Sequence, residues 1–501
     1  MPSPPKSGSG RLRLRALCLV GLLVLAGCSL GPSVSPSAPG LEDGNGDGDD
    51  RLGREAGYNA TDELSVTTDD GLNESERESV VARTIARVER VRQREFRERV
   101  PVRVVSRETF RDNRGGGNDS AAVRARDDQL WEATFAVDES TSSAAAFETV
   151  YGASVLGFYA DGEIVIVSES ETPRIDTRTL AHELVHALQA QHDDLGFGPS
   201  RHTRDGDLAR QGLTEGDANY VQDRYDARCG AEWSCLSTPN RSARERPEEF
   251  NDGIYMTLVQ PYVTGPAFVA ALHDRGGWTA VDDAYGAVPE TTAAVIRPER
   301  YGTERAGGGV EVPDRSSSAW SRFDVEHPTD RFGEAGTYVA LYQGGAIGDD
   351  HARYNYSHPY TAGWVGDRIV PYHDGDGDGG NADRYGYVWR TEWETERDAR
   401  EFLEGYRALL AAHNATRDGN VYVIPSGGFA DAFRVTRDGT TVTVVNAPTA
   451  EALGGIHAPA AVADTGAAVE ADGPSAGGTG PARPDRRRAD ATAGSRSPGL
   501  R

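Results

Sequence analysis

Residues 182–186 read His-Glu-Leu-Val-His, and this spacing constrains the chain more than any other feature of its sequence. On a helix, His182 and His186 stand four residues apart on one face, so both imidazoles reach the same cation. Glu183 is rotated by about 100° from His182 and places a carboxylate beside that cation without serving as a ligand. Neighbouring apolar residues favour burial of this stretch. The pattern therefore predicts an amphipathic helix over residues 178–192 that carries a metal site.

A third ligand stands on a second predicted helix, which spans residues 208–228. A catalytic zinc needs three protein ligands and one open position, and Glu215 lies 29 residues after His186. Gly216 follows it, although a glycine inside a helix costs about 1 kcal/mol relative to alanine. Together with Ala218, this glycine predicts a close approach of the two helices around the metal.

An HExxH motif followed at a distance by Glu-Gly-x-Ala resembles the gluzincin zinc metallopeptidases. The resemblance implies that His182, His186 and Glu215 bind one Zn²⁺ ion and that Glu183 activates a water molecule to hydrolyse a peptide bond. A wider similarity, over roughly residues 74–445, joins the chain to a group of haloarchaeal surface lipoproteins. The stretches that carry it are residues 179–192, 229–235, 276–285 and 387–393.

The resemblance also implies supporting residues around the metal. Asn219 stands one turn beyond Glu215, where related enzymes often hold an acid that orients a ligand histidine, and an amide carbonyl can do the same with less charge. The residue that stabilises the oxyanion is left open among five candidates. These candidates are Tyr255, Tyr262, His273, Arg297 and Tyr301.

Other interpretations of the motif also stay open. The two histidines could be unligated surface residues, or the zinc could be structural in a binding protein descended from a peptidase. His192 could replace Glu215 as the third ligand, because it stands ten residues beyond His182. A metzincin histidine at that spacing follows a glycine turn, however, which Ala190-Gln191 does not provide.

The N-terminus has the features of an export signal. Arginines precede an apolar run, Ala16–Gly27, that is too short to span a bilayer and has the size of a signal-peptide core. The run ends at Cys28 in a sequence that resembles the lipobox of prokaryotic lipoproteins. We therefore expect residues 1–27 to be removed and Cys28 to carry a lipid that anchors the chain to the outer face of the cell membrane. Ordinary secretory cleavage near residues 26–27 is the alternative.

The charge balance limits the partners of the chain. Acidic residues outnumber basic ones by 78 to 53, the net charge is −25, and Lys6 is the single lysine. Phosphates would be repelled, so we expect no nucleic-acid partner. Excess carboxylate with almost no lysine is typical of a surface that stays hydrated in concentrated salt, which predicts a halophilic protein.

Two weaker signals concern covalent and metal cross-links. Cys229 and Cys235 are six residues apart, and in an exported protein they favour a small disulfide loop over a reactive pair. The segment Asp374-Gly-Asp-Gly-Asp-Gly379 matches the start of a Ca²⁺ loop, but Tyr385 stands at the twelfth position where a glutamate would bind. This second segment favours a solvated acidic loop.

Composition and periodicity predict an α+β protein. A disordered acidic tether over residues 28–72 should precede the folded part. The resemblance to gluzincins implies a metallopeptidase-like domain over residues 73–310, with an edge strand beside the zinc helix. A smaller α+β region should follow over residues 311–456, then a disordered tail over residues 457–501. We expect a lipid-anchored zinc metallopeptidase that acts on peptides or proteins; the alternative is a non-catalytic surface lipoprotein with a structural or vestigial zinc site.

More detailed expectations concern individual elements. The first predicted helix spans residues 74–98, and a strand is expected at residues 164–167 after a turn at Asp161-Gly162. Residues 269–285 should be largely helical. In the second half, a helix is expected over residues 398–412. The strands expected there span residues 368–372, 386–389, 432–436 and 440–445.

Overall fold

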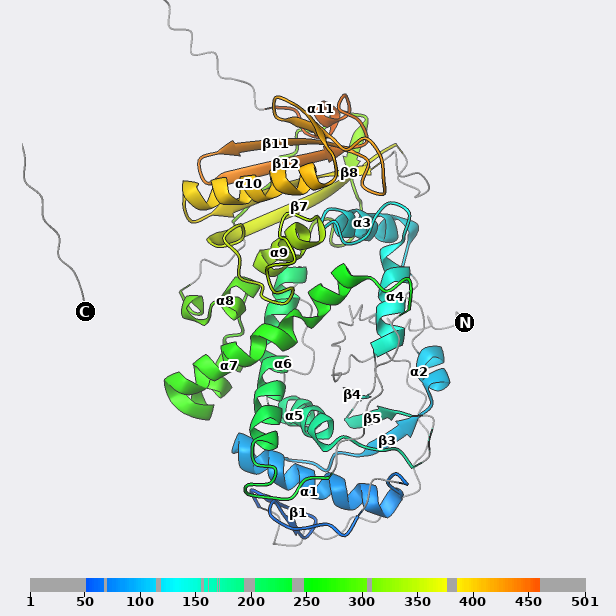
Figure 1. Ribbon diagram of the computed structural model, residues 1–501, viewed down its shortest axis with the longest axis vertical. Coiled ribbons are helices and arrows are strands. Elements are labelled where there is room, and N and C mark those ends of the chain that lie inside the picture. The colour runs from blue at the N-terminus through cyan, green and yellow to red at the C-terminus, as the bar shows by residue number, and fades with distance from the viewer. Residues whose placement is uncertain are drawn as a thin grey trace, which may run out of the picture. The chain divides into compact units, whose positions relative to one another are not determined.

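The computed structural model has the α+β architecture that the sequence predicts (Figure 1). The described residues are 51–66, 70–113, 119–154, 157–160, 162–168, 170, 172–192, 203–236, 247–303, 309–375 and 385–459. The expected signal peptide, Cys28, most of the acidic segment that begins at Asp374 and nearly all of the expected tail lie outside them. The described residues up to Ala458 belong to one compact unit. Within the described residues, no helix combines the length and the apolar character that crossing a membrane requires.

An N-terminal hairpin packs against the first long helix. Strands β1 (Arg54–Glu55) and β2 (Tyr58–Asn59) pair antiparallel, and α1 (Glu74–Arg92) follows. Asn73 caps α1 because its side chain accepts a hydrogen bond from the Glu76 backbone. The helix ends at Arg92, earlier than predicted, since the next residue adopts a left-handed conformation with φ of 59°.

The prediction of a disordered tether as far as residue 72 is wrong for the described part of that segment. Ala60 and Leu72 are buried in the core. The Gly53 amide donates to the Glu89 carboxylate over 2.9 Å, and Arg87 Nε donates to the Ala60 carbonyl over 2.7 Å. The low aliphatic content suggested disorder, but charged side chains on α1 satisfy the backbone of this segment, and composition does not reveal such contacts.

A three-stranded sheet lies next to the helix that carries the His-Glu-Leu-Val-His motif. β3 (Val102–Val105) runs parallel to the central strand β5 (Glu163–Val167), and β4 (Gly157–Ala160) pairs antiparallel with β5 at the edge. The motif helix α5 (Thr177–His192) contacts both β4 and β5. In chain order, three helices stand between β3 and β4, namely α2 (Arg107–Asn113), α3 (Ala121–Glu132) and α4 (Ser143–Ser154).

Helices α6 (Arg204–Asp226) and α7 (Asp252–Gly286) approach each other at the level of their backbones. A Cβ atom added to Gly216 would lie 2.5 Å from the Gly265 carbonyl oxygen, and one added to Gly265 would lie 2.4 Å from the Gly212 oxygen. The sequence predicts that Gly216 allows the two metal-bearing helices to approach each other. The structure places it instead against α7, which the prediction did not include.

Helix α7 begins 17 residues before the helix that was predicted over residues 269–285. Its first half contains Pro261 and Pro266, and a proline normally ends a helix because it lacks an N–H donor and its ring clashes with the preceding turn. α7 continues through both prolines and changes direction at Gly276-Gly277, where the backbone leaves helical geometry. Packing of α7 against α6 therefore outweighs the tendency of the two prolines to end the helix.

The C-terminal region is built on a seven-stranded antiparallel sheet with the order β6-β7-β8-β12-β11-β10-β9. The strands are β6 (Trp320–Arg322), β7 (Trp364–Asp374), β8 (Tyr385–Trp393), β9 (Thr416–Asp418), β10 (Val421–Val423), β11 (Ala432–Asp438) and β12 (Thr441–Ala447). The four strands predicted in this half lie on β7, β8, β11 and β12. The predicted helix is α10 (Glu396–Ala412), which lies across one face of the sheet (Figure 1).

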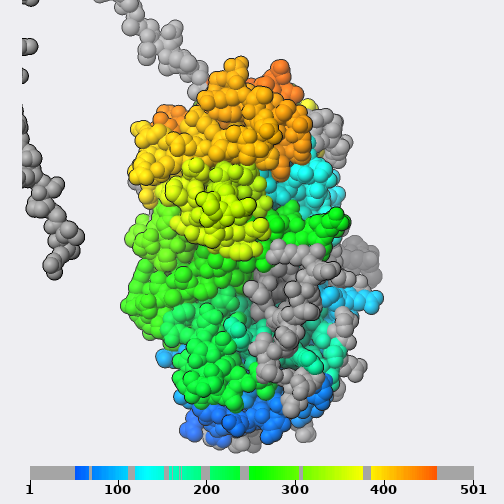
Figure 2. All heavy atoms as spheres, viewed as in Figure 1, coloured from blue at the N-terminus to red at the C-terminus, as the bar shows by residue number. Residues whose placement is uncertain are grey.

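Further short helices belong to this part of the compact unit. α8 (Thr292–Ile296) and a 3-10 turn (Pro298–Arg300) follow α7, and α11 (Leu453–Ile456) follows β12. α9 (Gly333–Gln343) contacts α6, α7 and β7, so it joins the helices to the sheet. Figure 2 shows the atoms around α9 and the start of β7 (yellow-green) between those of α7 (green) and those of the last strands (orange).

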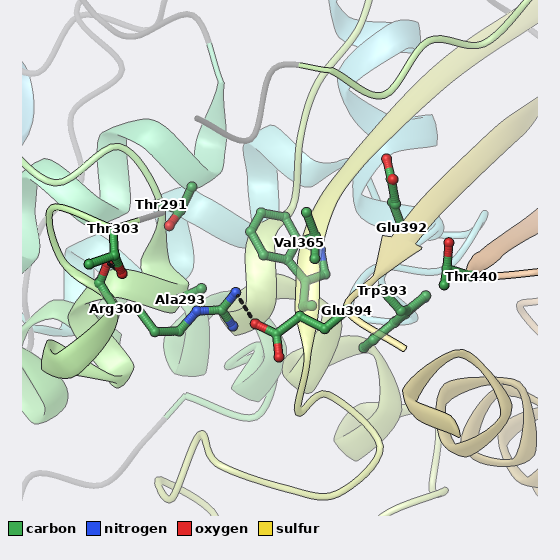
Figure 3. Close-up of a pocket in the computed structure, with 10 residues that line it drawn as sticks. Thr291, Ala293, Arg300, Thr303, Val365, Glu392, Trp393, Glu394 and Thr440 are labelled. Carbon is green, nitrogen blue, oxygen red and sulfur yellow. Dashed lines mark hydrogen bonds and ion pairs between the residues drawn. The ribbon is translucent and has the colours of Figure 1, made fainter. Parts of the chain in front are cut away.

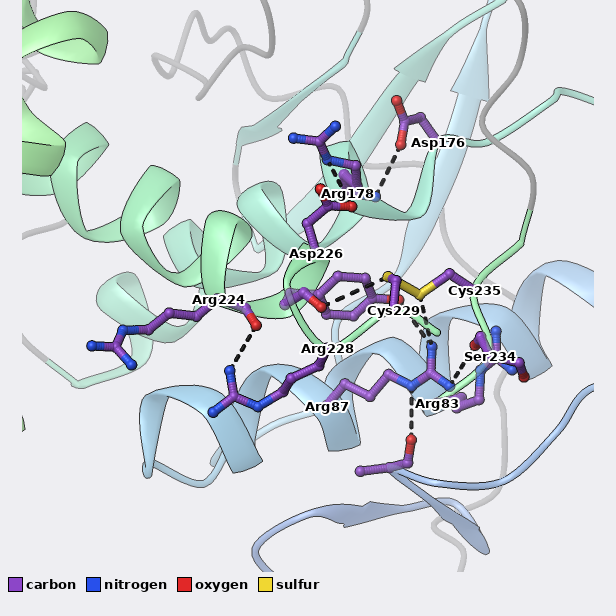
Figure 4. Close-up of a disulfide and its surroundings, with 12 residues drawn as sticks. Arg83, Arg87, Asp176, Arg178, Arg224, Asp226, Arg228, Cys229, Ser234 and Cys235 are labelled. Carbon is purple, nitrogen blue, oxygen red and sulfur yellow. Dashed lines mark hydrogen bonds and ion pairs between the residues drawn. A yellow bond between two sulfur atoms is a disulfide. The ribbon is translucent and has the colours of Figure 1, made fainter. Parts of the chain in front are cut away.

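Cys229 and Cys235 form the predicted disulfide just after α6 (Figure 4). The Arg87 side chain reaches it from α1 and is fully buried. Its guanidinium donates to the Ser234 carbonyl over 2.9 Å and to the Tyr225 hydroxyl over 3.2 Å. Arg87 also donates to the Ala60 carbonyl at the end of the N-terminal hairpin. Its hydrogen bonds therefore join α1, the hairpin and the disulfide loop into one unit.

We expect Gly265→Ala to destabilise the protein, because the new methyl group would overlap the α6 backbone and force the two helices apart. Overpacking of this kind costs about 1–3 kcal/mol, and urea unfolding in high salt measures it. Gly286→Ala in the same helix is the matched control, since a Cβ atom there has no neighbour within 4 Å. Equal losses of stability in the two variants would contradict the interpretation.

Candidate metal centre

Three side chains from α5 and α6 meet at one point. The Nε2 atoms of His182 and His186 are 3.0 Å apart, and each lies 3.2 Å from Glu215 Oε2. Ligand atoms about 2.0–2.1 Å from a tetrahedral zinc lie roughly 3.3 Å from one another. We call His182, His186 and Glu215 the metal triad. Their three ligand atoms form a nearly equilateral triangle of a size that suits one zinc ion.

The metal triad is buried and electrostatically coupled. The exposed fractions of His182, His186 and Glu215 are 0%, 4% and 5%. Burial lowers the pKa of His182. Burial also opposes a charge on His186, but the Glu215 carboxylate raises the pKa of His186 to about 9. Burial acts to raise the pKa of Glu215, but the two imidazoles outweigh this effect and lower that pKa to about 2. The triad is thus an environment that favours a bound positive charge.

Gln189 fixes the orientation of one imidazole. His186 Nδ1 lies 2.9 Å from Gln189 Oε1, and Gln189 Nε2 donates to the Thr214 carbonyl over 2.9 Å. Because an amide oxygen only accepts, Nδ1 of His186 carries a proton, and Nε2, which faces Glu215, is the atom that would bind a metal after losing its own proton. Sequence reasoning missed Gln189, although its position one helical turn after a ligand histidine was a usable signal.

Asn219 links the His182 imidazole to α7. Its Nδ2 donates to the Tyr262 carbonyl over 3.4 Å. Burial lowers the pKa of His182, and contacts with Glu215 and Asn219 act in the opposite direction. The residue therefore lies beside the ligand histidine that the sequence predicts it to orient.

Glu183 lies beside the metal triad and faces a cavity. Its side chain is 1% exposed, and its charge contributes, after that of Glu215, to the raised pKa of His186. It lines a cavity of about 190 Å³ together with Ile164 and Ile166 of β5 and with the first turn of α5. The residues that line this cavity do not include His182, His186 or Glu215.

Of the five candidates for the oxyanion, Tyr262 has a described contact with the metal triad. Its ring stacks on that of His182, with centroids 6.2 Å apart and planes inclined by 15°. The other four contact residues away from the triad. These contacts are Tyr255 with Tyr354, His273 with Trp278, the Tyr301 hydroxyl with the Ala287 carbonyl, and Arg297 with the buried Glu334 carboxylate.

An ionic network, buried at Arg92 and Asp217, supports α6 close to the metal triad. Arg92 Nε lies 3.0 Å from Asp217 Oδ1, and Arg92 Nη2 lies 2.6 Å from Asp282 Oδ1. The Tyr285 hydroxyl donates to Asp217 Oδ2 over 2.8 Å. Asp217 stands two residues after Glu215, so the network fixes the ligand-bearing turn against α1 and α7. Sequence analysis missed these residues because the partners are far apart in the chain.

Two other candidate regions lie apart from the metal triad. His192 Nε2 lies 2.6 Å from the Glu95 carbonyl oxygen, so the alternative third ligand faces a different part of the chain. A larger cavity of about 470 Å³ lies between the 3-10 turn and the ends of β7 and β8 (Figure 3). An ion pair between Arg300 and Glu394, 2.7 Å long, lies at its wall beside Trp364.

Comparison with known proteins adds one match. A family model described as a domain of unknown function (DUF8575) matches residues 321–457. This match covers the C-terminal sheet with α9, α10 and α11, and it does not include the metal triad. No curated protein and no solved structure matches the chain.

We expect His186→Ala and Glu215→Ala to lose bound zinc, because each removes one corner of the metal triad. Zinc content of the purified protein, measured by mass spectrometry after dialysis, tests this. His192→Ala is the control and should retain zinc at the wild-type level. Unchanged zinc in Glu215→Ala would remove Glu215 from the ligand set.

Proposed function

We propose that this protein is a zinc-dependent metallopeptidase of the gluzincin type, held at the outer face of the cell membrane by a lipid at Cys28. The observation that carries the proposal is the triangle of His182, His186 and Glu215, which has the dimensions of a zinc site. Glu183 beside this triangle supplies the base that metal-assisted hydrolysis requires.

In this mechanism the chain's own residues hold the metal and move protons. A zinc ion bound to the metal triad would lower the pKa of a water molecule toward about 7 and polarise the scissile carbonyl. Glu183 accepts the proton of the attacking water and passes it to the leaving amine. Gln189 keeps His186 in the tautomer that a ligand needs, and Asn219 restrains His182.

We assign stabilisation of the oxyanion to Tyr262. A phenol is a hydrogen-bond donor, and donors aimed at a developing negative charge supply a large part of the catalysis in acyl transfer. The stacking of its ring on that of His182 supports the assignment, because it places the Tyr262 side chain next to a member of the metal triad.

The expected substrate is an extended peptide. β4 is an edge strand, and it lies against the motif helix. An edge strand offers backbone donors and acceptors to which a peptide can pair as an additional strand. The acidic composition of the chain and its scarcity of lysine support activity in concentrated salt.

A second candidate is a non-catalytic surface lipoprotein in which the zinc site is structural or vestigial. The observation that favours it is the burial of the metal triad and of Glu183, each 5% exposed or less. Structural zinc sites are closed by protein ligands, whereas catalytic sites keep one position open for water. Turnover of peptides by the zinc-loaded protein separates the two candidates.

We expect Glu183→Gln to keep its fold and its zinc but to lose peptide hydrolysis, because the amide cannot accept the proton of the water. General acid–base catalysis typically contributes about 10²–10⁴-fold, so the rate should fall by at least that factor. The assay is cleavage of a peptide mixture in high salt with and without chelator. Glu163→Gln, an acid on β5, is the control; full activity of Glu183→Gln would defeat its assigned role.

Tyr262→Phe should reduce the turnover number with little change in KM, because the hydroxyl is expected to act on the transition state. Loss of one oxyanion donor costs about 10²–10³-fold in kcat. Tyr255→Phe, seven residues earlier in α7, is the matched control and should retain activity. Equal rates for wild type and Tyr262→Phe would exclude Tyr262 as the donor.

A further inference from the structure

The larger cavity, between the 3-10 turn and the C-terminal sheet, has the size of a small-molecule site (Figure 3). Its volume of about 470 Å³ falls within the range of roughly 300–1,000 Å³ that is typical of such sites. The helical part of the chain contributes Thr291 and Arg300 to its lining, and the sheet contributes Trp364 and Trp393, which face each other across β7 and β8. We call it the Arg300 cavity. Its lining includes no residue of the metal triad.

Two hydrogen-bond donors in the wall of the Arg300 cavity have no partner within the described part of the chain. They are Nε1 of Trp364, a residue that is 1% exposed, and Nη1 of Arg300, whose side chain is 19% exposed. Folded proteins pair nearly all buried donors, because an unpaired donor has lost its hydrogen bonds to water. Two such donors in the wall of one cavity therefore indicate that a bound molecule brings acceptor atoms to it.

The charges in the wall favour a neutral ligand. Arg300 Nη2 lies 2.7 Å from Glu394 Oε1, so these two charges compensate each other, and Glu392 is the third charged side chain of the lining. A bound anion would meet two carboxylates, whereas a bound cation would meet the guanidinium. Figure 3 shows the Arg300 and Glu394 side chains meeting in the cavity, with Glu392 apart from them.

Hydroxyl groups are the neutral groups that match this wall. A hydroxyl accepts hydrogen bonds and donates one, so it can accept from Trp364 Nε1 or Arg300 Nη1 and donate to the Glu392 carboxylate. The hydroxyls of Thr303 and Thr440, which also line the cavity, can both donate and accept. The two indole rings offer apolar surface to C–H groups. A ligand with many hydroxyls on an apolar ring has both properties.

We propose that the Arg300 cavity binds a neutral carbohydrate of one or two sugar units, with Trp364 and Arg300 as donors and Glu392 as an acceptor. This binding is separate from the proposed peptide hydrolysis and does not require zinc. The site also combines two parts of the chain. Trp364 and Glu392 lie within the segment that the family model matches, residues 321–457, whereas Arg300 lies before it. The matched segment alone would therefore lack one of the two donors.

The test uses the full mature chain, loaded with zinc, in high KCl. Maltose, cellobiose and N,N′-diacetylchitobiose are each titrated in a calorimeter, and glucuronate and glycine betaine are the charged comparators. We expect at least one of the three disaccharides to bind as one molecule per chain and more tightly than either comparator. If none of the three shows saturable binding, or if a comparator binds more tightly, the proposal is overturned.

Variants locate the binding. Trp364→Phe removes the indole N–H and keeps an aromatic ring, and Arg300→Gln removes the guanidinium. Each should weaken disaccharide binding by about tenfold, the loss expected for one hydrogen bond. Arg300→Gln tests the site if substitution of the buried Trp364 prevents folding. Arg397→Gln, on α10 with a side chain that is 78% exposed, should bind like wild type, and so should His186→Ala. Wild-type affinity in both Trp364→Phe and Arg300→Gln would place the sugar elsewhere and would overturn the site.

Discussion

The contact between the backbones of α6 and α7 determines where the functional side chains stand. Glu215 precedes the glycine that α7 covers, and Tyr262 is three residues before the glycine that α6 covers. Because no side chain separates the helices at this crossing, small changes there would move a metal ligand and the assigned oxyanion donor together. Arg92 and Asp217 then hold the same turn of α6 from another direction. The position of the third ligand is thus set by contacts that lie outside the metal triad itself.

The sequence predicts the local parts of this arrangement and misses the long-range ones. His182, Glu183 and His186 share one helix, so their common face follows from helical geometry, and Glu215 follows from the chemistry of a three-ligand site. The first half of α7 was missed because Pro261 and Pro266 normally terminate helices, and packing against α6 outweighs that preference. The role assigned to Gly216 failed for the same reason, because its partner Gly265 lies in the helix that was not foreseen.

Buried charges are a second feature that the sequence does not reveal. Composition indicates an acidic, lysine-poor surface, but it does not indicate which charges are buried. Arg87, Arg92 and Asp217 are at most 2% exposed, and each has charged or polar partners from distant segments. The shared face of His182 and His186 and the disulfide follow from spacing in the chain. The pairing of Arg92 with Asp217 depends on how α1 meets α6, which no local pattern encodes.

The hydrogen bonds of Arg87 have a mechanical consequence for a chain held at its N-terminus. Tension from an anchor at Cys28 would enter the described structure at residue 51, reach the hairpin, and pass through the guanidinium into α1 and the disulfide loop. Those bonds would bear the load in parallel, and the disulfide would stop the loop from extending. Because Tyr225 lies in α6 and Arg92 of α1 pairs with Asp217, part of this pull would also reach the helix that carries Glu215, so tension at the N-terminus would act on the site.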